Sequence, residues 1–313
     1  MTLERCFCFK SASFKEGITD MDKLFEGSAT ALITPFWNNA VDYGSMADII
    51  DFQIESGTDA LVVCGTTGEV STLSKKERER LIEFTVEKSA GRVPVIAGTG
   101  GNNTEVAVEM SIYARKVGAD GILSVAPYYN KGTKDGIIRH YSYIAEKCEL
   151  PVIVYNVPSR TGVSLTPQMY YELSNIPNVN AIKEANGNPA SWLATRRLCG
   201  DSMALYSGND SDTLQMMALG AKGVISVASN VVPKIVSDMC RAELSGDRNK
   251  ALTVCLECSE LFDVLFKEVN PVPVKYAMSK IGLCRNELRL PLTPCTKETE
   301  TAIDTVLSKL GLI

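Results

Sequence analysis

The chain has very little histidine and no concentrated positive charge. Its 313 residues include a single histidine, His140. One imidazole cannot build a histidine-rich metal site, and its helical, Tyr-flanked setting predicts packing or a surface role rather than part of a Ser-His triad. The formal net charge is -5, and no basic cluster with interleaved aromatic residues occurs. Nucleic acid and anionic membranes are therefore poor candidate partners.

Long apolar runs are also missing. No run approaches the ~18 residues that a membrane-spanning helix needs. Residues 1–20 carry scattered charges and lack the apolar segment of a secretory signal. We expect residues 1–24 to be a leader outside the fold, either disordered or a gene-start artefact with Met21 as the functional start. A cytoplasmic protein is expected.

Cysteine is frequent but not patterned. The ten cysteines are scattered, and without a secretory signal they predict buried, reduced thiols. The one CxxC spacing, Cys255 and Cys258, lies in a helix-like run and has no second pair, which favours core packing over a zinc or redox site. We therefore expect neither a metal nor a cofactor.

What is present is a regular alternation of short apolar segments and amphipathic runs. Hydrophobic residues make up 45% and charged residues 22%, typical of a globular protein with a large core. The predicted strands are Ala29–Thr34, Ala60–Val63, Val93–Ala97, Gly121–Val125, Pro151–Tyr155, Val179–Lys183, Met203–Ser207 and Gly223–Val227.

Helical patterns separate these strands, and their starts carry capping residues or proline. Eight β/α units indicate an α/β fold, a (β/α)8 TIM barrel, over residues 25–246. A doubly wound sheet is the competitor, but the Gly-rich dinucleotide turn after the first strand is missing. Residues 247–313 have a purely helical period and predict a C-terminal helical layer. The expected helices are Met46–Glu55, Lys75–Ser89, Glu105–Val117, Gly136–Cys148, Gln168–Leu173, Ala190–Cys199, Ser211–Leu219, Pro233–Leu244, Asp247–Val269, Val272–Ile281 and Lys297–Leu310.

A lysine closes the sixth predicted strand. In a parallel barrel Lys183 would lie at the carboxyl end of its strand, where such folds build active sites. An ammonium partly removed from water has a lowered pKa and becomes an amine nucleophile towards a ketone. Taken alone, the segment 177–185 fits a solvated lysine at a strand edge better.

Other strand ends carry polar groups that could face the same rim. Gly65-Thr66-Thr67-Gly68-Glu69 can turn backbone N–H groups and hydroxyls towards an anion, although a plain turn explains it as well. Tyr128-Tyr129 follows the fourth strand, where ordinary packing is the default. Tyr155 ends the fifth strand and can shuttle a proton, and Arg160 in the next loop can clamp a carboxylate.

The last two strands add a glycine and a backbone segment. Gly208 follows the seventh strand as a close-approach glycine, and the eighth contains Ile225. An amine, hydroxyls, a phenol and an anion clamp at one rim, without metal ligands, suggest Schiff-base carbonyl chemistry.

From about Phe25 to its end, the chain resembles the class I pyruvate aldolase family, which includes N-acetylneuraminate lyase, and within it the 4-hydroxy-tetrahydrodipicolinate (dihydrodipicolinate) synthases. The motifs that carry the resemblance are Gly65-Thr66-Thr67-Gly68-Glu69, Pro127-Tyr128-Tyr129-Asn130, Tyr155 to Gly162, Ile182-Lys183-Glu184 and Asn270-Pro271-Val272-Pro273-Val274-Lys275. The resemblance implies an enzyme that condenses pyruvate with L-aspartate 4-semialdehyde in lysine and diaminopimelate biosynthesis.

The resemblance also implies catalytic roles. Lys183 would form the imine with pyruvate. Tyr155 would donate and accept protons, linked through Thr66 to Tyr129, which in this family reaches in from a neighbouring subunit. A homotetramer built as a dimer of dimers is implied.

The implied substrate-binding residues surround this group. Thr67 and the backbone near Ile225 would hold pyruvate, and Arg160 would hold the carboxylate of the semialdehyde, with Gly208 at the same rim.

Two rivals remain from the sequence. A sialic-acid-type lyase or another pyruvate aldolase would share the lysine and tyrosine, but such relatives usually lack the arginine matching Arg160 and commonly have serine in place of Thr66. A barrel that binds an oxo-acid without converting it would have no need of a proton relay.

The regulatory site of lysine-inhibited relatives is only partly matched. Asn102 and Tyr128 match that site, but Lys75 and Arg78 replace its histidines, and Val106 replaces its glutamate. We therefore expect lysine not to inhibit, although binding through Asn102 and Tyr128 alone is the alternative.

Overall fold

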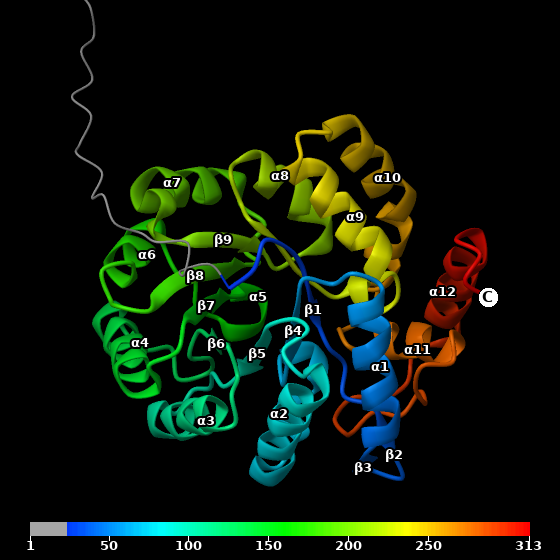
Figure 1. Ribbon diagram of the computed structural model, residues 1–313, viewed down its shortest axis with the longest axis horizontal. Helices are drawn as coiled ribbons and strands as arrows, with labels where there is room; N and C mark the ends of the chain where they lie inside the picture. Colours follow the sequence, from blue (N-terminus) through cyan, green and yellow to red (C-terminus); the bar gives the residue numbers. More distant parts are fainter. Residues whose placement is uncertain (1–23) are drawn as a thin grey trace, which may run out of the picture.

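The computed structural model describes residues 24–313, so the expectations for the leader fall outside the described residues except at Leu24. Eight parallel strands close into a barrel inside a ring of helices (Figure 1). Around the barrel their order is β1-β10-β9-β8-β7-β6-β5-β4. The predicted (β/α)8 barrel is confirmed. Its strands are β1 Gly27–Ala31, β4 Ala60–Val63, β5 Val95–Gly98, β6 Gly121–Val125, β7 Val152–Asn156, β8 Val179–Glu184, β9 Ala204–Ser207 and β10 Gly223–Ser226.

Alternation along each strand divides the apolar side chains between two cores. Val62, Ile96 and Ile153 fill the barrel interior. Their neighbours in sequence, such as Leu61 and Ala97, pack outward against the helices. Because successive strand residues point to opposite faces, both cores come from the same short apolar runs.

Helices follow the barrel strands and cover the outside of the barrel (Figure 1). They are α1 Tyr43–Glu55, α2 Lys75–Ser89, α3 Thr104–Lys116, α4 Lys134–Cys148, α5 Pro158–Thr161, α6 Pro167–Leu173, α7 Pro189–Cys199, α8 Thr213–Ala218 and α9 Pro233–Leu244. Helix α2 begins as predicted, after a capping box made by Ser74 and Glu77. Helices α3 and α4 begin slightly earlier than expected, because Asn103 and Thr133 accept the first free backbone N–H groups.

The C-terminal helices lie to one side of the barrel, beside α1 and α9 (Figure 1). They are α10 Arg248–Val264, α11 Val272–Lys280 and α12 Lys297–Lys309. Helix α10 packs on α9, and α12 packs on α10 and α11. A small hairpin of β2 Phe36–Trp37 and β3 Ala40–Val41 was not expected from the sequence. Within residues 24–313, no helix has the length and apolar character to cross a membrane.

Candidate active site

Lys183 and Tyr155 lie side by side at the carboxyl ends of two neighbouring strands. They are register partners on β8 and β7. Both side chains are buried, at 5% and 7% exposure, and the Lys183 Nζ lies 4.5 Å from the centre of the Tyr155 ring. The alternative of a solvated lysine at a strand edge is therefore wrong.

Burial sets the electrostatics of this lysine. Removal from water lowers the pKa of Lys183 to about 8; the Asp210 carboxylate opposes this shift and the Arg160 guanidinium adds to it. An ammonium with this pKa supplies a substantial fraction of neutral amine near pH 8, which a nucleophile requires.

The Thr66 hydroxyl is hydrogen-bonded to Tyr155, whereas the side chain of Tyr129 is exposed to solvent. Burial raises the pKa of Tyr155, and the Arg160 charge and a hydrogen bond with the Thr66 hydroxyl act in the opposite direction. Tyr129 is 88% exposed and has a left-handed backbone (φ 70°). Within the described chain, the phenol of Tyr129 thus stands in solvent outside its own barrel.

The turn after β4 is fixed by groups from distant segments. The buried Thr67 hydroxyl accepts a hydrogen bond from Asn270 Nδ2 at 3.1 Å. The Thr34 hydroxyl donates to the Gly68 carbonyl at 2.7 Å. Glu69 has a left-handed backbone (φ 54°) and is buried. The turn is therefore a rigid element of the rim rather than a mobile loop.

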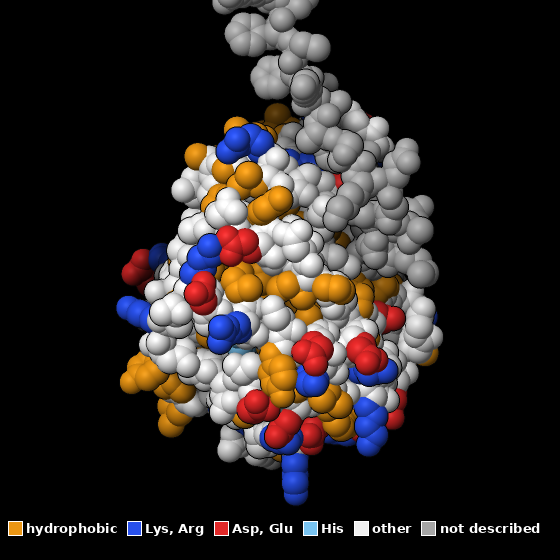
Figure 2. Space-filling model, turned by 90° about the vertical axis from the view of Figure 1, so that its left-hand side faces the viewer, with side chains coloured by type: hydrophobic (Ala, Val, Ile, Leu, Met, Phe, Trp, Pro, Cys, Tyr) orange, Lys and Arg blue, Asp and Glu red, His pale blue; other side chains and the backbone are white. Residues whose placement is uncertain are grey.

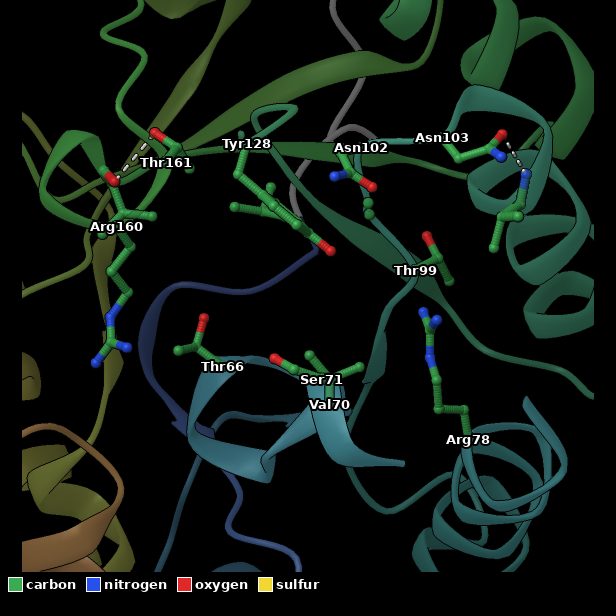
Figure 3. A pocket seen from close by; sticks show the side chains of 15 residues that line it. Thr66, Val70, Ser71, Arg78, Thr99, Asn102, Asn103, Tyr128, Arg160 and Thr161 are labelled. Atoms are coloured by element: carbon green, nitrogen blue, oxygen red, sulfur yellow. Dashed lines mark hydrogen bonds between the residues drawn. The ribbon is translucent and has the colours of Figure 1, made fainter. Parts of the chain in front are cut away.

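Arg160 lies on α5, a short helix that Pro158 begins after β7. Its guanidinium donates to the Asn270 carbonyl at 2.9 Å and lines a cavity of about 390 Å³. Figure 3 shows Arg160 on one side of this cavity and Thr66 near its floor. Because Asn270 also donates to Thr67, one residue links the arginine to the turn after β4.

Gly208 and Ile225 both lie in tightly packed surroundings. A Cβ atom at Gly208 would lie 2.9 Å from the Ala185 Cβ and 3.1 Å from the Glu184 carbonyl, so only glycine fits beside β8. Ile225 is fully buried inside the barrel on β10.

Three residues of the site were not identified from the sequence. Asp210, which precedes the predicted helix Ser211–Leu219, is buried; it accepts from the Ser226 hydroxyl and from the backbone N–H groups of Val227 (3.1 Å) and Ala228 (3.0 Å). Asn270 lies in one of the motifs that carry the family resemblance, but the sequence indicated no role for it. The third is Glu184.

Glu184 lies behind Lys183 and faces away from the barrel interior. Its carboxylate accepts from the Tyr170 hydroxyl at 2.7 Å and from Asn156 Nδ2 at 2.9 Å. Burial raises the pKa of Glu184 to about 7, against these hydrogen bonds, which lower it. No local sequence pattern marks this group, because its partners come from β7 and α6.

His140 lies apart from this site, as do the described cysteines except Cys64, which lines a small cavity together with Thr66 and Tyr155. His140 is buried, its Nδ1 lies 2.9 Å from the Thr104 hydroxyl, and burial lowers its pKa to about 4. The described cysteines are unpaired thiols; Cys258 is buried in the core as predicted, whereas Cys255 and Cys284 are only partly buried. Residues 24–313 contain no cluster of three or more His, Cys, Asp or Glu side chains that could ligate a metal ion.

Known proteins match nearly the whole chain. The sequence profile of the Dihydrodipicolinate synthetase family matches residues 24–310. The 4-hydroxy-tetrahydrodipicolinate synthase of Thermoanaerobacter sp. is 46% identical over 93% of this chain and 98% of its own length. That of Aquifex aeolicus is 47% identical over 92% and 99%.

Solved structures agree with the sequence matches. Dihydrodipicolinate synthase from Aquifex aeolicus superposes with a TM-score of 0.91 at 47% identity, covering 92% of this chain and 99% of its own. The enzyme from Thermotoga maritima gives a TM-score of 0.91 at 41% identity, covering 93% and 100%. The chain belongs to the dihydrodipicolinate synthetase family.

Proposed function

We propose that this chain is an enzyme, a class I Schiff-base lyase that condenses pyruvate with L-aspartate 4-semialdehyde to 4-hydroxy-tetrahydrodipicolinate in lysine and diaminopimelate biosynthesis. The observation that carries the proposal is the buried Lys183, with its pKa lowered to about 8, beside the Tyr155 phenol at the barrel rim. The family membership supports the same chemistry. A cytoplasmic location is part of the proposal.

The bond-making steps use Lys183, Tyr155 and the two substrates. The neutral Lys183 amine adds to the pyruvate ketone, and loss of water gives an iminium. Loss of a methyl proton forms an enamine, whose carbon adds to the aldehyde, and a proton from Tyr155 neutralises the resulting alkoxide. The amine of the semialdehyde then adds to the iminium carbon, closes the ring and releases Lys183.

The other residues bind and relay protons. Thr67 and the backbone near Ile225 hold the pyruvate carboxylate, Arg160 holds the semialdehyde carboxylate, and Gly208 lets the substrate approach the rim. Thr66 connects Tyr155 to the Tyr129 of a second copy of the chain. The fixed turn after β4 and the short helix of Arg160 support these roles, because preorganised donors need little rearrangement.

Tyr129 takes part only if a second copy of the chain supplies it. Its 88% exposure fits a side chain that projects into a neighbour, in a homotetramer built from two dimers. Large hydrophobic residues are also exposed on α3, α6 and α7 (Val106, Ile112, Tyr171 and Leu193). Figure 2 shows several hydrophobic patches among charged side chains on the face that carries these helices.

The rival functions fit less well. Arg160 and Thr66 favour the synthase over a sialic-acid-type lyase, which remains the second candidate. A non-catalytic oxo-acid binder would not need a lysine with a lowered pKa beside a buried phenol.

Reduction of the imine tests the proposal directly. After treatment with pyruvate and borohydride, the peptide containing Lys183 should gain the mass of a reduced pyruvyl group. A coupled assay with pyruvate and aspartate semialdehyde should show turnover that this treatment abolishes. The assignment fails if another residue is modified, or if activity survives complete modification of Lys183.

A further inference from the structure

Glu184 is a buried carboxylate that is held by hydrogen bonds alone. It is 2% exposed, and within residues 24–313 no lysine or arginine forms an ion pair with it. Its contacts are all donors: the Tyr170 hydroxyl at 2.7 Å, Asn156 Nδ2 at 2.9 Å and the Asn186 backbone N–H at 3.0 Å. Because a carboxylate only accepts hydrogen bonds, three donors fit its ionised form. Such a group is costly to bury without a cation, which points to a role at the site.

Glu184 and Asn156 lie directly behind Lys183 and Tyr155. On β7, Asn156 follows Tyr155, and on β8, Glu184 follows Lys183. The two strands are in register, so Tyr155 is paired with Lys183 and the next residue of each strand with its counterpart. Because successive strand residues point to opposite faces, the first pair faces the barrel interior and the second faces α6. The hydrogen bond between Asn156 and Glu184 therefore joins the two strand ends from behind.

The Asn156 side chain also closes the loop that carries Arg160. Its Oδ1 accepts from the Leu165 backbone N–H at 3.2 Å, while its Nδ2 donates to Glu184. Residues 157–166 leave the barrel sheet after β7 and include α5, on which Arg160 lies (Figure 3). The loop thus starts beside Asn156 and returns to its side chain, and Glu184 fixes the orientation of that amide.

Lys183, by contrast, is held by the sheet itself. Its strand pairs with β7 on one side and with β9 on the other. The Gly208 backbone N–H donates to the Glu184 carbonyl at 2.7 Å. These bonds use main-chain atoms, so a change in the Glu184 side chain leaves them in place. A disturbance of the Glu184 carboxylate should therefore reach Arg160 more than Lys183.

We propose that Glu184 is a positioning residue for the second substrate. Its carboxylate orients the Asn156 amide, which closes the α5 loop and sets the Arg160 guanidinium where the semialdehyde carboxylate binds. Tyr170 supports this carboxylate from α6. Glu184 touches neither substrate and transfers no proton. The inference rests on the proposed function, because it takes Arg160 as the group that holds the semialdehyde.

Glu184→Gln tests this role. Glutamine has nearly the same size, but its NH2 group must face one of the donors that the carboxylate satisfies. At about pH 9 wild-type Glu184 is ionised and Lys183 is largely neutral. There, kcat/KM for the semialdehyde should fall about ten-fold. Borohydride trapping of pyruvate on Lys183 should stay within about two-fold of the wild-type rate. Tyr170→Phe, which removes one donor, should cause a smaller loss of the same kind.

A double-mutant cycle with Arg160→Ala separates positioning from a general structural role. If Glu184 acts through Arg160, Glu184→Gln should lower kcat/KM for the semialdehyde hardly further once Arg160 is replaced. A role in packing alone would lower it by the same factor in both backgrounds. Tyr170→Phe supplies the same cycle if Glu184→Gln does not fold.

Tyr141→Phe is the matched control. Tyr141 is a buried tyrosine on α4 whose hydroxyl donates to the Ser124 carbonyl of β6 at 3.1 Å, so this change removes a comparable bond away from the α5 loop. It should leave kcat/KM for the semialdehyde unchanged.

Four results would overturn the inference while the proposed function stands. They are losses that multiply in the cycle, equal losses in trapping and in use of the semialdehyde, unchanged kcat/KM in both Glu184→Gln and Tyr170→Phe, and an equal loss in Tyr141→Phe. A wild type that traps no pyruvate or does not convert the semialdehyde would instead overturn the proposed function, and the inference with it.

Discussion

Lys183 is held between two charges of opposite sign. Burial lowers its pKa, the Asp210 carboxylate raises it and Arg160 lowers it further. The nearby carboxylate favours the ammonium, so it limits how far burial can shift the lysine. The pKa of about 8 is thus a compromise between residues from three different segments.

Asp210→Asn should shift the titration of Lys183 to lower pH. The substitution keeps the size of the side chain but removes the charge that favours the protonated lysine, so the pKa of Lys183 should fall below about 8. The rate of borohydride-trapped imine formation at limiting pyruvate rises as the amine loses its proton, and its midpoint should therefore shift to lower pH. Asp212→Asn, in the same turn, is the control. An unchanged midpoint in Asp210→Asn would contradict the electrostatic role.

Arg160→Ala should impair the use of the semialdehyde but not the formation of the pyruvate imine on Lys183. Loss of a bidentate pair with the semialdehyde carboxylate should cost roughly 1.5–3 kcal/mol, about ten- to a hundred-fold in kcat/KM for the aldehyde. Trapping of pyruvate on Lys183 should persist. Because the Arg160 charge lowers the pKa of Lys183, its removal raises that pKa, and trapping should be compared above about pH 9. An equal loss with both substrates would make Arg160 a structural residue.

At the scale of elements, the C-terminal helices hold the turn after β4. Lys275 on α11 pairs with Glu69 at 2.6 Å, and both side chains are fully buried. The Arg289 backbone N–H donates to the same carboxylate at 3.1 Å. Asn270, before α11, donates to Thr67. The division at residue 246 remains a prediction, but residues beyond it position part of the rim.

Lys275→Met should be strongly destabilising, because it leaves the Glu69 charge buried without its cation. The free energy of unfolding in urea should fall by about 3–5 kcal/mol. Adding Glu69→Gln removes the unpaired charge and should recover part of this loss. Lys280→Met is the matched control: the side chains of its pair with Asp304 are 37% and 36% exposed, and its loss should cost at most about 1 kcal/mol. If both single variants were equally mild, the buried pair would not be what fixes the turn.

At the scale of the whole molecule, the face formed by α2 and α3 bears on regulation. Lys75 is exposed and pairs with Glu109 at 2.7 Å, so its charge is largely compensated. Arg78 remains uncompensated, and Val106 is 42% exposed. The expected repulsion of a lysine ligand therefore comes mainly from Arg78, with Val106 unable to meet an ammonium.

We predict that free lysine does not inhibit the enzyme. A unit-charge contact at ~4 Å is worth about 1 kcal/mol in water and more at a partly dry site. Lysine titrated into the coupled assay should leave the rate unchanged up to about 1 mM. A dissociation constant of that size corresponds to a binding free energy near -4 kcal/mol. The variant that combines Lys75→His, Arg78→His and Val106→Glu should be more sensitive to inhibition by lysine than the wild type. Inhibition of the wild type below that concentration would mean that Asn102 and Tyr128 suffice.

The sequence by itself determined the barrel and the place of its lysine. Apolar runs separated by helical periods are local signals, so the strands, most helix starts and the position of Lys183 at a strand end could be predicted. Tyr155 and Arg160 were also singled out at their strand ends, and the motif resemblance added the link from Tyr155 through Thr66 to Tyr129 and the semialdehyde carboxylate that Arg160 would hold. The exact caps of α3 and α4 were missed because neighbouring polar residues compete for the same N–H groups.

Only the tertiary structure decided what surrounds these residues. Asp210 looked like a helix-start residue, but its carboxylate binds the end of β10, and Asn270 reaches across to Thr67. The lowered pKa of Lys183 depends on burial and on charges contributed by β9–α8 and β7–α5 segments. Such effects arise between residues distant in sequence, and desolvation depends on everything packed around a group, so no local pattern can carry them.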